Sequence, residues 1–323
     1  MRLLFASLAS VGHTYPMIPL AIAARDAGHE VWFAAGEGVH STLSANGLRP
    51  FRPADSFYEI YAEDLEPDLA RLRPDLVIHG WGVPGVAVAA HRAGVPGLWH
   101  GFGRMFPEGI GLDRPTAGSH LDICPPSLQD KDFLAAGSRI ELRPVPYSTP
   151  GPEWGSAPLI YLTLGTAFGT PELLRTAIEG LARLGVEVVV AAGRVPLEEL
   201  EDVPDNVAVR AWVPQADLLR HAAVVVHHGG SGTTLGALTV GAPQLVLPQG
   251  ADQFANAEAI HDAGAGIRLL DVTADAIAEH ANTLLRSLPH RAAARAIASE
   301  IAAMPSPEEV VSRLPEVAST ICQ

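Results

Sequence analysis

Short apolar runs that alternate with segments of helical spacing constrain this chain more than any other feature of its sequence. The runs Leu3–Ser7, Glu30–Ala35 and Leu159–Thr163 are predicted to be buried strands, and Pro16–Ala27 and Pro171–Leu184 to be helices. Strands separated by helices favour a parallel sheet with right-handed crossovers. The alternation occurs twice, so the sequence predicts an α/β chain with two Rossmann-like halves, whose parallel sheets face each other across an interdomain cleft.

The remaining elements continue this alternation. Further strands are predicted at Asp75–His79, Val95–His100, Val186–Ala192, Val207–Ala211, Ala223–His227, Gln244–Leu247 and Gly266–Leu269. Further helices are predicted at Val39–Ala45, Gly85–Ala93, Gly230–Val240, Gln253–Ala263, Ala274–Ser287 and His290–Met304.

A proline-rich stretch separates the two halves. Residues from about Gly101 to Gly155 lack the alternation, so we expect a loop followed by an interdomain linker. The predicted domains are therefore residues 1–145 and 146–323. The last helix of the second domain is a candidate to return and pack on the first.

Composition excludes several classes of protein. The net charge of −14 and the single lysine, Lys131, give no basic stripe for a nucleic-acid backbone. Cys124 and Cys322 are far apart and outside any C-x-x-C motif, which is typical of a reducing compartment without structural zinc. A chain of this kind is expected to act in the cytoplasm on small molecules. The sequence leaves a homodimer open.

The first residues have two interpretations. Arg2 followed by an apolar run resembles a signal peptide, but the run is short and passes directly into Gly12-His13-x-x-Pro16, which favours a buried first strand. No stretch approaches the roughly 20 apolar residues that a membrane span requires, so stable membrane insertion is not expected.

A glycine-rich turn, His228-Gly229-Gly230-Ser231-Gly232-Thr233, is the most informative segment for chemistry. It follows the β-branched strand that ends at His227 and precedes a helix, so free backbone N–H groups and the positive helix end point at one place. Glycines let the backbone approach a phosphate, and the hydroxyls and imidazole add donors. The alternative is a turn needed only for helix–sheet packing. The turn matches neither the Walker A motif nor G-x-G-x-x-G.

Two other strand-end segments add candidate ligand contacts. In Trp212-Val213-Pro214-Gln215, an aromatic ring beside a proline-fixed backbone can stack on a base, although a tryptophan at a strand end is also a common core residue. In Pro248-Gln249-Gly250-Ala251-Asp252-Gln253, a carboxylate and an amide can bind sugar hydroxyls, and Asp252 can also be a helix N-cap.

Together these segments resemble the donor-binding domain of the family 1 nucleotide-sugar glycosyltransferases, which have the GT-B fold. They are most similar to bacterial enzymes that glycosylate antibiotics and other natural products, usually from TDP-sugars. The W-V-P-Q, H-H-G-G-S-G-T and P-Q-G-A-D-Q segments follow the order and approximate spacing of that family. The resemblance implies an acceptor-binding N-terminal domain and a donor-binding C-terminal domain.

The resemblance also implies roles for particular residues. It places Trp212 and Val213 at the nucleotide base, Thr166 near the phosphates, and Asp252 and Gln253 at the donor sugar. It implies no cofactor and no metal; a TDP- or UDP-sugar is the co-substrate, and a small hydrophobic natural product such as a polyketide is the acceptor. The diphosphate is held by the glycine-rich turn, at His228, Gly229, Gly230, Ser231, Gly232 and Thr233.

His13, in the segment Ser10-Val11-Gly12-His13-Thr14-Tyr15-Pro16, is the predicted catalytic residue. In the family, a histidine after the first strand is the general base, and an imidazole suits proton removal near neutral pH. A single displacement would invert the anomeric centre, and the helix end would stabilise the leaving diphosphate. The alternative is a histidine that makes only a structural hydrogen bond.

The chain departs from the family at three points. No acidic residue ends the strand Leu76-Val77-Ile78-His79-Gly80, so the partner of His13 is open and His79 is one candidate. The stretches after Pro53 and after Gly101 are short for acceptor loops. Asp130-Lys131-Asp132 matches a D-x-D metal motif, but we expect a solvated charge cluster.

Two rival functions follow from these departures. A nucleotide-sugar epimerase of the same fold would cleave the same bond without an acceptor. A non-catalytic accessory protein would bind the nucleotide sugar and transfer nothing.

Overall fold

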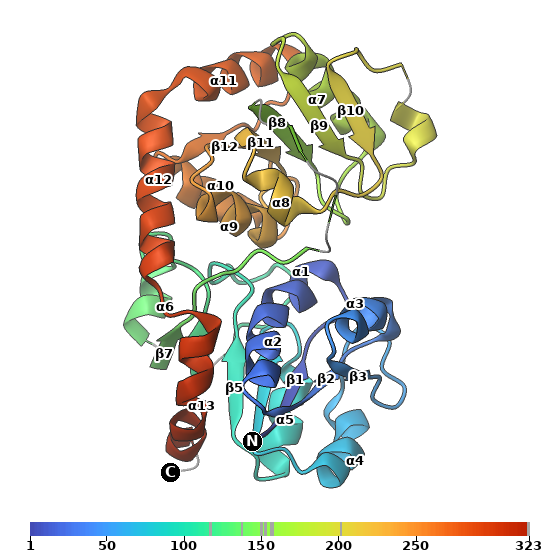
Figure 1. Ribbon diagram of the computed structural model, residues 1–323, viewed down its shortest axis with the longest axis vertical. Coiled ribbons are helices and arrows are strands. Elements are labelled where there is room, and N and C mark those ends of the chain that lie inside the picture. The colour runs from blue at the N-terminus through green and yellow to red at the C-terminus, as the bar shows by residue number, and fades with distance from the viewer. Residues whose placement is uncertain are drawn as a thin grey trace. The chain divides into compact units, whose positions relative to one another are not determined.

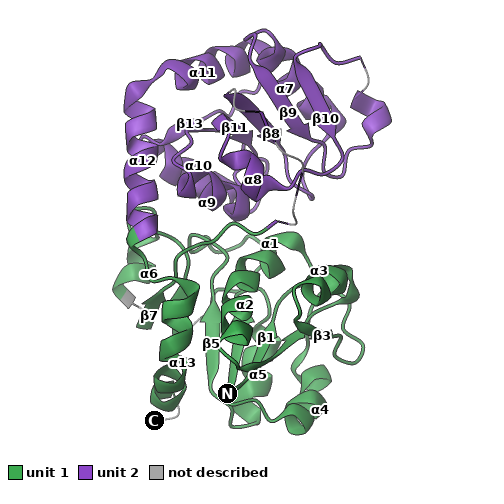
Figure 2. Cartoon of the chain, in the orientation of Figure 1, with its two compact units in different colours: residues 1–147, 303–323 green, residues 148–302 purple. Residues whose placement is uncertain are grey.

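The computed structural model describes residues 1–115, 118–136, 138–148, 151, 154–155, 158–200 and 202–321. The chain forms two compact units (Figure 2), one of residues 1–147 with 303–323 and the other of residues 148–302. Each unit contains one parallel sheet covered by helices. This is the predicted two-domain α/β architecture.

The sheet of the first unit has the order β3-β2-β1-β4-β5-β6-β7, and every neighbouring pair is parallel. Its strands are β1 (Arg2–Ala6), β2 (Glu30–Ala34), β3 (Arg49–Phe51), β4 (Leu76–Gly80), β5 (Gly97–His100), β6 (Ser119–Asp122) and β7 (Ser138–Glu141). The α-helices are α1 (Val11–Thr14), α2 (Ile18–Asp26), α3 (His40–Ala45), α4 (Ala62–Leu72), α5 (Pro84–Arg92), α6 (Lys131–Ala136) and α13 (Pro307–Ile321), with short 3-10 turns at Tyr15–Met17 and Glu37–Val39.

Helices cover both faces of this first sheet (Figure 1). On one face, Leu4 and Val77 pack against Leu65 of α4 and Val86 of α5. On the other side, α13 packs against α2, which brings residues from the end of the chain into the first unit. The last helix therefore belongs to the same compact unit as the first strand.

The sheet of the second unit has the order β10-β9-β8-β11-β12-β13 and is also entirely parallel. Its strands are β8 (Leu159–Thr163), β9 (Glu187–Ala191), β10 (Val207–Arg210), β11 (Ala222–His227), β12 (Gln244–Val246) and β13 (Gly266–Arg268). Its helices are α7 (Pro171–Ala182), α8 (Gln215–Leu219), α9 (Ser231–Thr239), α10 (Gln253–Asp262), α11 (Ala274–Arg286) and α12 (Leu288–Ala303), with a 3-10 turn at Leu197–Leu200.

Strand alternation divides the core of the second unit between the two faces of the sheet. Ile160 and Leu162 join α7 and α11 in one cluster, whereas Leu159 and Tyr161 join α8 and α9 in another. A strand that is buried on both faces has continuous apolar sequence. This explains why β8 and β11 stand out as unbroken apolar runs.

The expectation of a loop and linker between Gly101 and Gly155 was wrong in part, because β6, α6 and β7 lie there. β6 has no continuous apolar run, because two of its buried residues, His120 and Asp122, are polar. β7 is only partly buried and has no apolar run of its own. The sheet of the first unit is thus two strands wider than this proline-rich stretch suggests.

The short elements α1, α8 and β3 escaped prediction, and so did two of the longer helices, α4 and α13. In α4, Leu65, Leu69 and Leu72 form a buried stripe, but Pro67 lies inside the helix and conceals the pattern. In α13, Val310, Val311 and Leu314 are buried, and Pro315 lies inside. In both helices, packing of the apolar face outweighs the lost backbone hydrogen bond.

Each strand order reverses direction at one point. In the first unit the reversal falls between β1 and β4, and in the second between β8 and β11. In doubly wound sheets, ligands bind outside the carboxyl ends of the strands at such a switch point. The segment with His13 follows β1, and the glycine-rich turn follows β11, so both candidate regions begin at a switch point.

A row of buried aromatic and imidazole rings crosses the first sheet. His79, Trp99 and His120 are register neighbours on β4, β5 and β6, and the His79 ring lies 4.3 Å from that of Trp99. Burial lowers the pKa of His79 to about 3 and the pKa values of His100 and His120 to about 4. These rings are neutral in the folded protein at neutral pH.

We therefore expect the free energy of unfolding to fall as the pH is lowered from about 6.5 towards 4. The pKa of His79 is lower in the folded state, so the unfolded chain binds more protons in this window and acid favours it. Each such histidine contributes a slope of up to about 1.4 kcal/mol per pH unit. Burial raises the pKa of Asp122 to about 6, which acts in the opposite direction below that pH.

Denaturant unfolding of the parent and of His79→Phe, measured between pH 7.5 and pH 4.5, isolates one histidine. The variant should show the flatter dependence on pH, whatever its absolute stability. Equal slopes in the two proteins would contradict a buried neutral imidazole at this position.

Candidate functional site

The turns after β8 and β11 approach each other closely. Gly165 has a φ of 71°, and a Cβ atom there would lie 2.6 Å from Cε1 of His228. A Cβ atom at Gly230 would lie 2.5 Å from Nε2 of the same ring. The His228 ring therefore fits between two residues that have no side chain, which only glycine permits.

His228 is a neutral ring with an unused atom. Burial lowers its pKa to about 4, while a hydrogen bond with the backbone of Thr163 acts in the opposite direction. Its Nδ1 atom is buried and has no hydrogen-bond partner among the described residues. A buried polar atom without a partner is costly. Because the ring donates to the Thr163 backbone and Nδ1 has no partner in the described part of the chain, the proton of the neutral ring lies on Nε2. A ligand donor at Nδ1, or an anion once the ring is protonated, would remove that cost.

His227, the residue before it, shapes the turn. Its Nδ1 accepts a hydrogen bond from the Gly229 N–H at 3.0 Å, and its Nε2 lies 2.8 Å from Oε1 of Gln244. Since the amide oxygen can only accept, the proton of His227 lies on Nε2. Gly229 has a φ of 93°, and a Cβ atom there would lie 2.9 Å from the Gln253 carbonyl oxygen. His227 and Gly229 together form the bend.

The start of α9 is left without a side-chain cap. Gly230 is the N-cap residue, and no side-chain hydrogen bond is made at this end of the helix. The first N–H groups of the helix, at Ser231, Gly232 and Thr233, have no acceptors within the helix. The site of Gly232 is open, because a Cβ atom there would have no neighbour within 4 Å. This end can bind an anion.

Thr233 connects the glycine-rich turn to the W-V-P-Q segment. Its Oγ1 donates to Oε1 of Gln215 at 3.1 Å, so these two predicted ligand segments are in direct contact. Trp212 is 46% exposed, which excludes the core interpretation of this ring, whereas Val213 is buried in the core. Thr166 is exposed after β8.

Asp252 is joined to the glycine-rich turn through its side chain. Its Oδ2 accepts hydrogen bonds from Ser231 Oγ at 3.0 Å and from Asn256 Nδ2 at 3.0 Å. It occupies the N-cap position of α10 but makes no side-chain capping bond. Burial raises its pKa, and the bonds from Ser231 and Asn256 act in the opposite direction.

Gln253 is buried and stabilises the loop before it. Its Oε1 accepts from the N–H groups of Gln249 at 2.8 Å and Gly250 at 3.2 Å. The side-chain oxygen of this predicted sugar ligand is therefore engaged within the protein, and its amide nitrogen is the group left for a ligand.

In the first unit, His13 lies at the start of the fold's first helix. Thr14 Oγ1 donates to the Leu8 carbonyl oxygen at 2.9 Å, which fixes the turn from β1 into α1. The His13 ring lies 4.9 Å from the Phe102 ring in an edge arrangement, and 3.4 Å separates its Cε1 from the position of a Cβ at Gly82. Burial lowers its pKa to about 4.

The acidic partner of His13 is not found in the described part of the chain. No carboxylate there hydrogen-bonds to the ring, and burial is the only cause of its lowered pKa. His79, the other candidate partner, contacts Trp99 within the sheet, which agrees with a strand-end histidine of the core.

The D-x-D segment has a structural role at Asp130. Its Oδ1 accepts from the Phe133 N–H at 3.0 Å at the start of α6, and its Oδ2 lies 3.5 Å from Arg104. Within the described ranges, no cluster of three or more histidine, cysteine or acidic residues could hold a metal ion. No helix in those ranges is long and apolar enough to cross a membrane. Cys322 lies outside the described residues.

Three polar residues of this site were missed by sequence reasoning. Asn256 Nδ2 lies 2.8 Å from the Gly229 carbonyl oxygen and also within reach of Ser231 and Asp252. Its position four residues after Asp252, on the same side of α10, was the available signal. Gln215 and Gln244 act through long-range bonds, for which the sequence holds no signal.

Several known proteins are similar to this chain in sequence. Residues 175–317 match the family model described as Erythromycin biosynthesis protein CIII-like, C-terminal domain. The chain is 33% identical to the L-demethylnoviosyl transferase of Streptomyces niveus and 32% identical to the Elloramycin glycosyltransferase ElmGT of Streptomyces olivaceus. Each alignment covers 97% of this chain and 97% of the relative.

Solved structures extend the likeness to the whole fold. The spinosyn rhamnosyltransferase SpnG complexed with thymidine diphosphate is 29% identical, with a TM-score of 0.78 over 98% of this chain and 100% of that one. The structure of SpnG complexed with spinosyn aglycone is 28% identical, with a TM-score of 0.81 over 98% of this chain and 100% of that one.

Two doubly wound units, with a glycine-rich turn at the switch point of the second, define the class of GT-B glycosyltransferases. The chain belongs to the family of glycosyltransferases of antibiotic biosynthesis. The alignment with the transferase of Streptomyces niveus spans 374 positions, more than the 323 residues of this chain, so that relative has segments which this chain lacks.

Asn256 gives a test of the geometry of this site. Replacing it by alanine leaves the Gly229 carbonyl, Ser231 and Asp252 without their shared partner, so we expect the free energy of unfolding to fall by about 1–3 kcal/mol. Denaturant unfolding measures this change.

Asn282→Ala is the matched control, because Asn282 only accepts an exposed hydrogen bond from Arg286. It should change stability by less than about 0.5 kcal/mol. If the two alanine variants lose the same stability, the bonds of Asn256 do not hold the turn together.

Proposed function

We propose that this glycosyltransferase moves a sugar from a nucleotide diphosphate donor, of TDP-deoxysugar type, to a small hydrophobic natural product, with inversion and without a metal. The uncapped start of α9 beside the unpartnered Nδ1 of His228 is the observation that carries the proposal. An oxygen-rich dianion accepts from the amides of α9, and its negative charge favours a protonated His228 ring, whose Nδ1–H can then donate to it.

The donor assignment rests on convergence of groups in the second unit. The N–H groups at the start of α9 and the His228 ring are placed to bind the two phosphates, whose charge favours the protonated ring. Both would stabilise the charge on the leaving diphosphate. Trp212 offers an exposed ring to the base. In this proposal, the free oxygen of Asp252 and the amide nitrogen of Gln253 bind the hydroxyls of the donor sugar. SpnG, which has been solved with thymidine diphosphate, supports TDP as the nucleotide.

The proposal makes His13 the general base. With a pKa of about 4 its ring is unprotonated at neutral pH, as a proton acceptor must be. Such a ring is a weak base, so it takes the proton late. The acceptor hydroxyl becomes strongly acidic as its oxygen bonds to the anomeric carbon, and the proton then passes to Nδ1 or Nε2 of His13. The bond between the sugar and the diphosphate breaks in the same step.

The acceptor class rests on the surroundings of His13. Phe102 borders the ring, and Trp81, Met105 and Phe106 form an apolar cluster with it. A carbon-rich acceptor is favoured by such surfaces. The spinosyn aglycone bound by SpnG is an acceptor of this chemical type.

A thermal-shift experiment with TDP tests the donor site. Saturating the wild type with TDP at a hundredfold excess over Kd should stabilise it by about 2.7 kcal/mol. Gly232→Asp should weaken binding at least about tenfold, because a carboxylate at an open position beside the helix start repels phosphate.

Gly232→Asn is the matched control, of almost the same size and without the charge. Both side chains fit, since nothing lies within 4 Å of the added Cβ. TDP should still shift the melting temperature of the asparagine variant. Equal TDP shifts in both variants would show that the diphosphate does not bind at the start of α9.

Removing the base tests the chemistry. His13→Ala should lower the rate of sugar transfer by about 10²–10⁴ and leave the TDP shift unchanged. In the wild type, kcat/KM for the acceptor should stay level between pH 7 and pH 5, because the pKa of His13 lies at about 4. A fall in kcat/KM below pH 6.5 would indicate a base with the pKa of free imidazole.

The rival functions give different results in the same assays. An epimerase would convert the donor sugar without an acceptor. An accessory protein would bind TDP and neither transfer nor hydrolyse any donor, and that outcome would overturn the proposal of transfer.

A further inference from the structure

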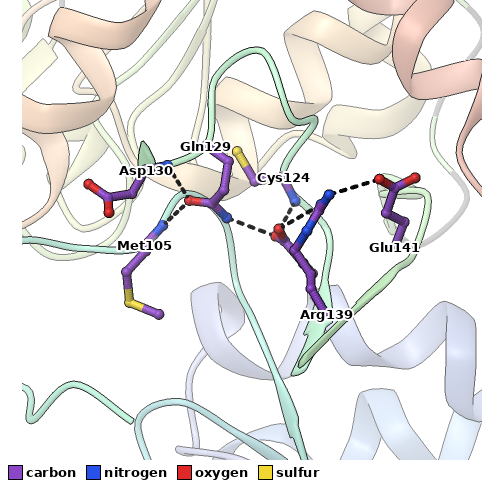
Figure 3. A network of polar contacts seen from close by, with 7 residues as sticks. Met105, Cys124, Gln129, Asp130, Arg139 and Glu141 are labelled. Atoms are coloured by element: carbon purple, nitrogen blue, oxygen red, sulfur yellow. Dashed lines mark hydrogen bonds and ion pairs between the residues drawn. The ribbon is translucent and has the colours of Figure 1, made fainter. Parts of the chain in front are cut away.

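A polar network lies at the carboxyl end of the first sheet, on the strand that sequence reasoning did not find. Asp122 is the last residue of β6 and is 0% exposed. Its Oδ1 accepts from the Cys124 N–H and from Gln129 Nε2, both at 2.9 Å, and its Oδ2 accepts from Arg139 at 3.2 Å. Figure 3 shows these contacts, with Glu141 beyond Arg139.

The carboxylate orients the amide of Gln129. Since an ionised carboxylate only accepts, the nitrogen of Gln129 must face Asp122 and its oxygen must face away. That oxygen accepts from the N–H groups of Met105 and Asp130, both at 2.7 Å (Figure 3). Gln129 thus connects β6 with the loop that follows β5.

This loop borders the predicted base. Arg104 Nε donates to the Leu128 carbonyl oxygen at 3.1 Å, which makes a second connection between the loop and the turn before α6. Phe102 and Phe106 stack at 5.7 Å, and Phe102 lies edge-on to His13 at 4.9 Å. The chain of contacts runs from Arg139 through Asp122, Gln129 and the loop to the His13 ring.

We propose that Asp122 and Gln129 are positioning residues for the acceptor side of the site, which hold the loop 101–106 so that Phe102 covers His13. This inference rests on the proposed role of His13 as base. Neither residue contacts the base directly; both act through the loop.

Simple stability does not explain this network. Burial raises the pKa of Asp122 to about 6 even though Cys124, Gln129 and Arg139 all donate to it. A buried ion pair is commonly no more stabilising than apolar side chains of the same size. The carboxylate fixes the direction of the Gln129 amide, which an apolar residue would not do. The amide oxygen is therefore in place to accept from the Met105 N–H.

Covering by Phe102 has a measurable consequence at His13. The lowered pKa of this ring has burial as its cause and no contribution from a charged side chain of the described residues. A loosened loop admits water to the ring, so its pKa should rise from about 4 towards 6.5. The base would then be partly protonated near pH 6.

The test compares three variants in the full-length protein. Gln129→Met removes the acceptor of the Met105 N–H at nearly constant size. D122N/Q129E exchanges the two groups, so that the amide at position 122 donates to the carboxylate at position 129, which still accepts from Met105. The Cys124 N–H loses its acceptor in this variant, because Oδ1 of Asp122 accepts from both Cys124 and Gln129. Glu141→Gln is the control, because Glu141 contacts Arg139 at the outer end of the network.

For Gln129→Met, kcat/KM for the acceptor should fall about 10–100-fold, with KM for the donor and the TDP shift unchanged. Its kcat/KM should also fall below pH 6.5, where the wild type stays level. D122N/Q129E should recover part of the acceptor kcat/KM, since it restores the acceptor of the Met105 N–H but not that of the Cys124 N–H. Glu141→Gln should resemble the wild type. Unchanged acceptor kinetics and pH dependence in Gln129→Met would overturn the inference, as would a fall in Glu141→Gln of the same size.

Titration of the His13 ring by NMR separates this inference from the proposed function. A wild type that transfers no sugar would end the proposal of transfer, but the pKa of His13 would still report on the loop. An equal His13 pKa in the wild type and Gln129→Met would reject the positioning role. If Gln129→Met does not fold, the pKa of His13 is compared between Asp122→Asn and D122N/Q129E. Only the double variant should retain the low pKa of His13.

Discussion

The donor side of this enzyme depends on how closely two strand-end turns approach at the switch point of the second sheet. The His228 ring fits between Gly165 and Gly230 only because neither carries a Cβ atom, and Gly229 bends over the Gln253 backbone for the same reason. This close approach leaves the first amides of α9 uncapped and beside a neutral imidazole. The proposed diphosphate site therefore depends on missing side chains as much as on present ones.

The sequence predicts the parts of the fold that are buried on both faces. β8 and β11 were found because continuous apolar strands between two helical layers leave no ambiguity in the pattern. β6 was missed because its buried residues include His120 and Asp122. They bond to Trp81 and Arg139, which are 39 and 17 residues away in the sequence. Pro67 concealed α4, since sequence rules give weight to the lost hydrogen bond and none to the tertiary packing that compensates for it.

The residues of the candidate site also differ in whether the sequence can predict them. Residues whose contribution is a local backbone shape, such as Gly229 and Gly232, can be predicted from the motif that contains them. Residues that act by joining segments cannot: Asn256 ties α10 to the glycine-rich turn, and Gln244 sets the tautomer of His227. His228 was the histidine predicted to bind the ligand, and the structure shows that its neighbour His227 is engaged in shaping the turn.

The two units differ in how they place polar groups, and the difference follows from what each must bind. A diphosphate is the same in every donor, so backbone amides on rigid strand ends can bind it. A short sequence motif determines the geometry of these amides. An acceptor differs from enzyme to enzyme, so the loop beside His13 must be able to change in sequence while keeping its position. A network such as Asp122 and Gln129 meets that need, because it holds the loop through the Met105 backbone N–H, which is present whatever side chain occupies that position. On the proposed roles, the other side chains of the loop can vary while Phe102 stays against His13, so that acceptor choice is separated from the geometry of proton transfer.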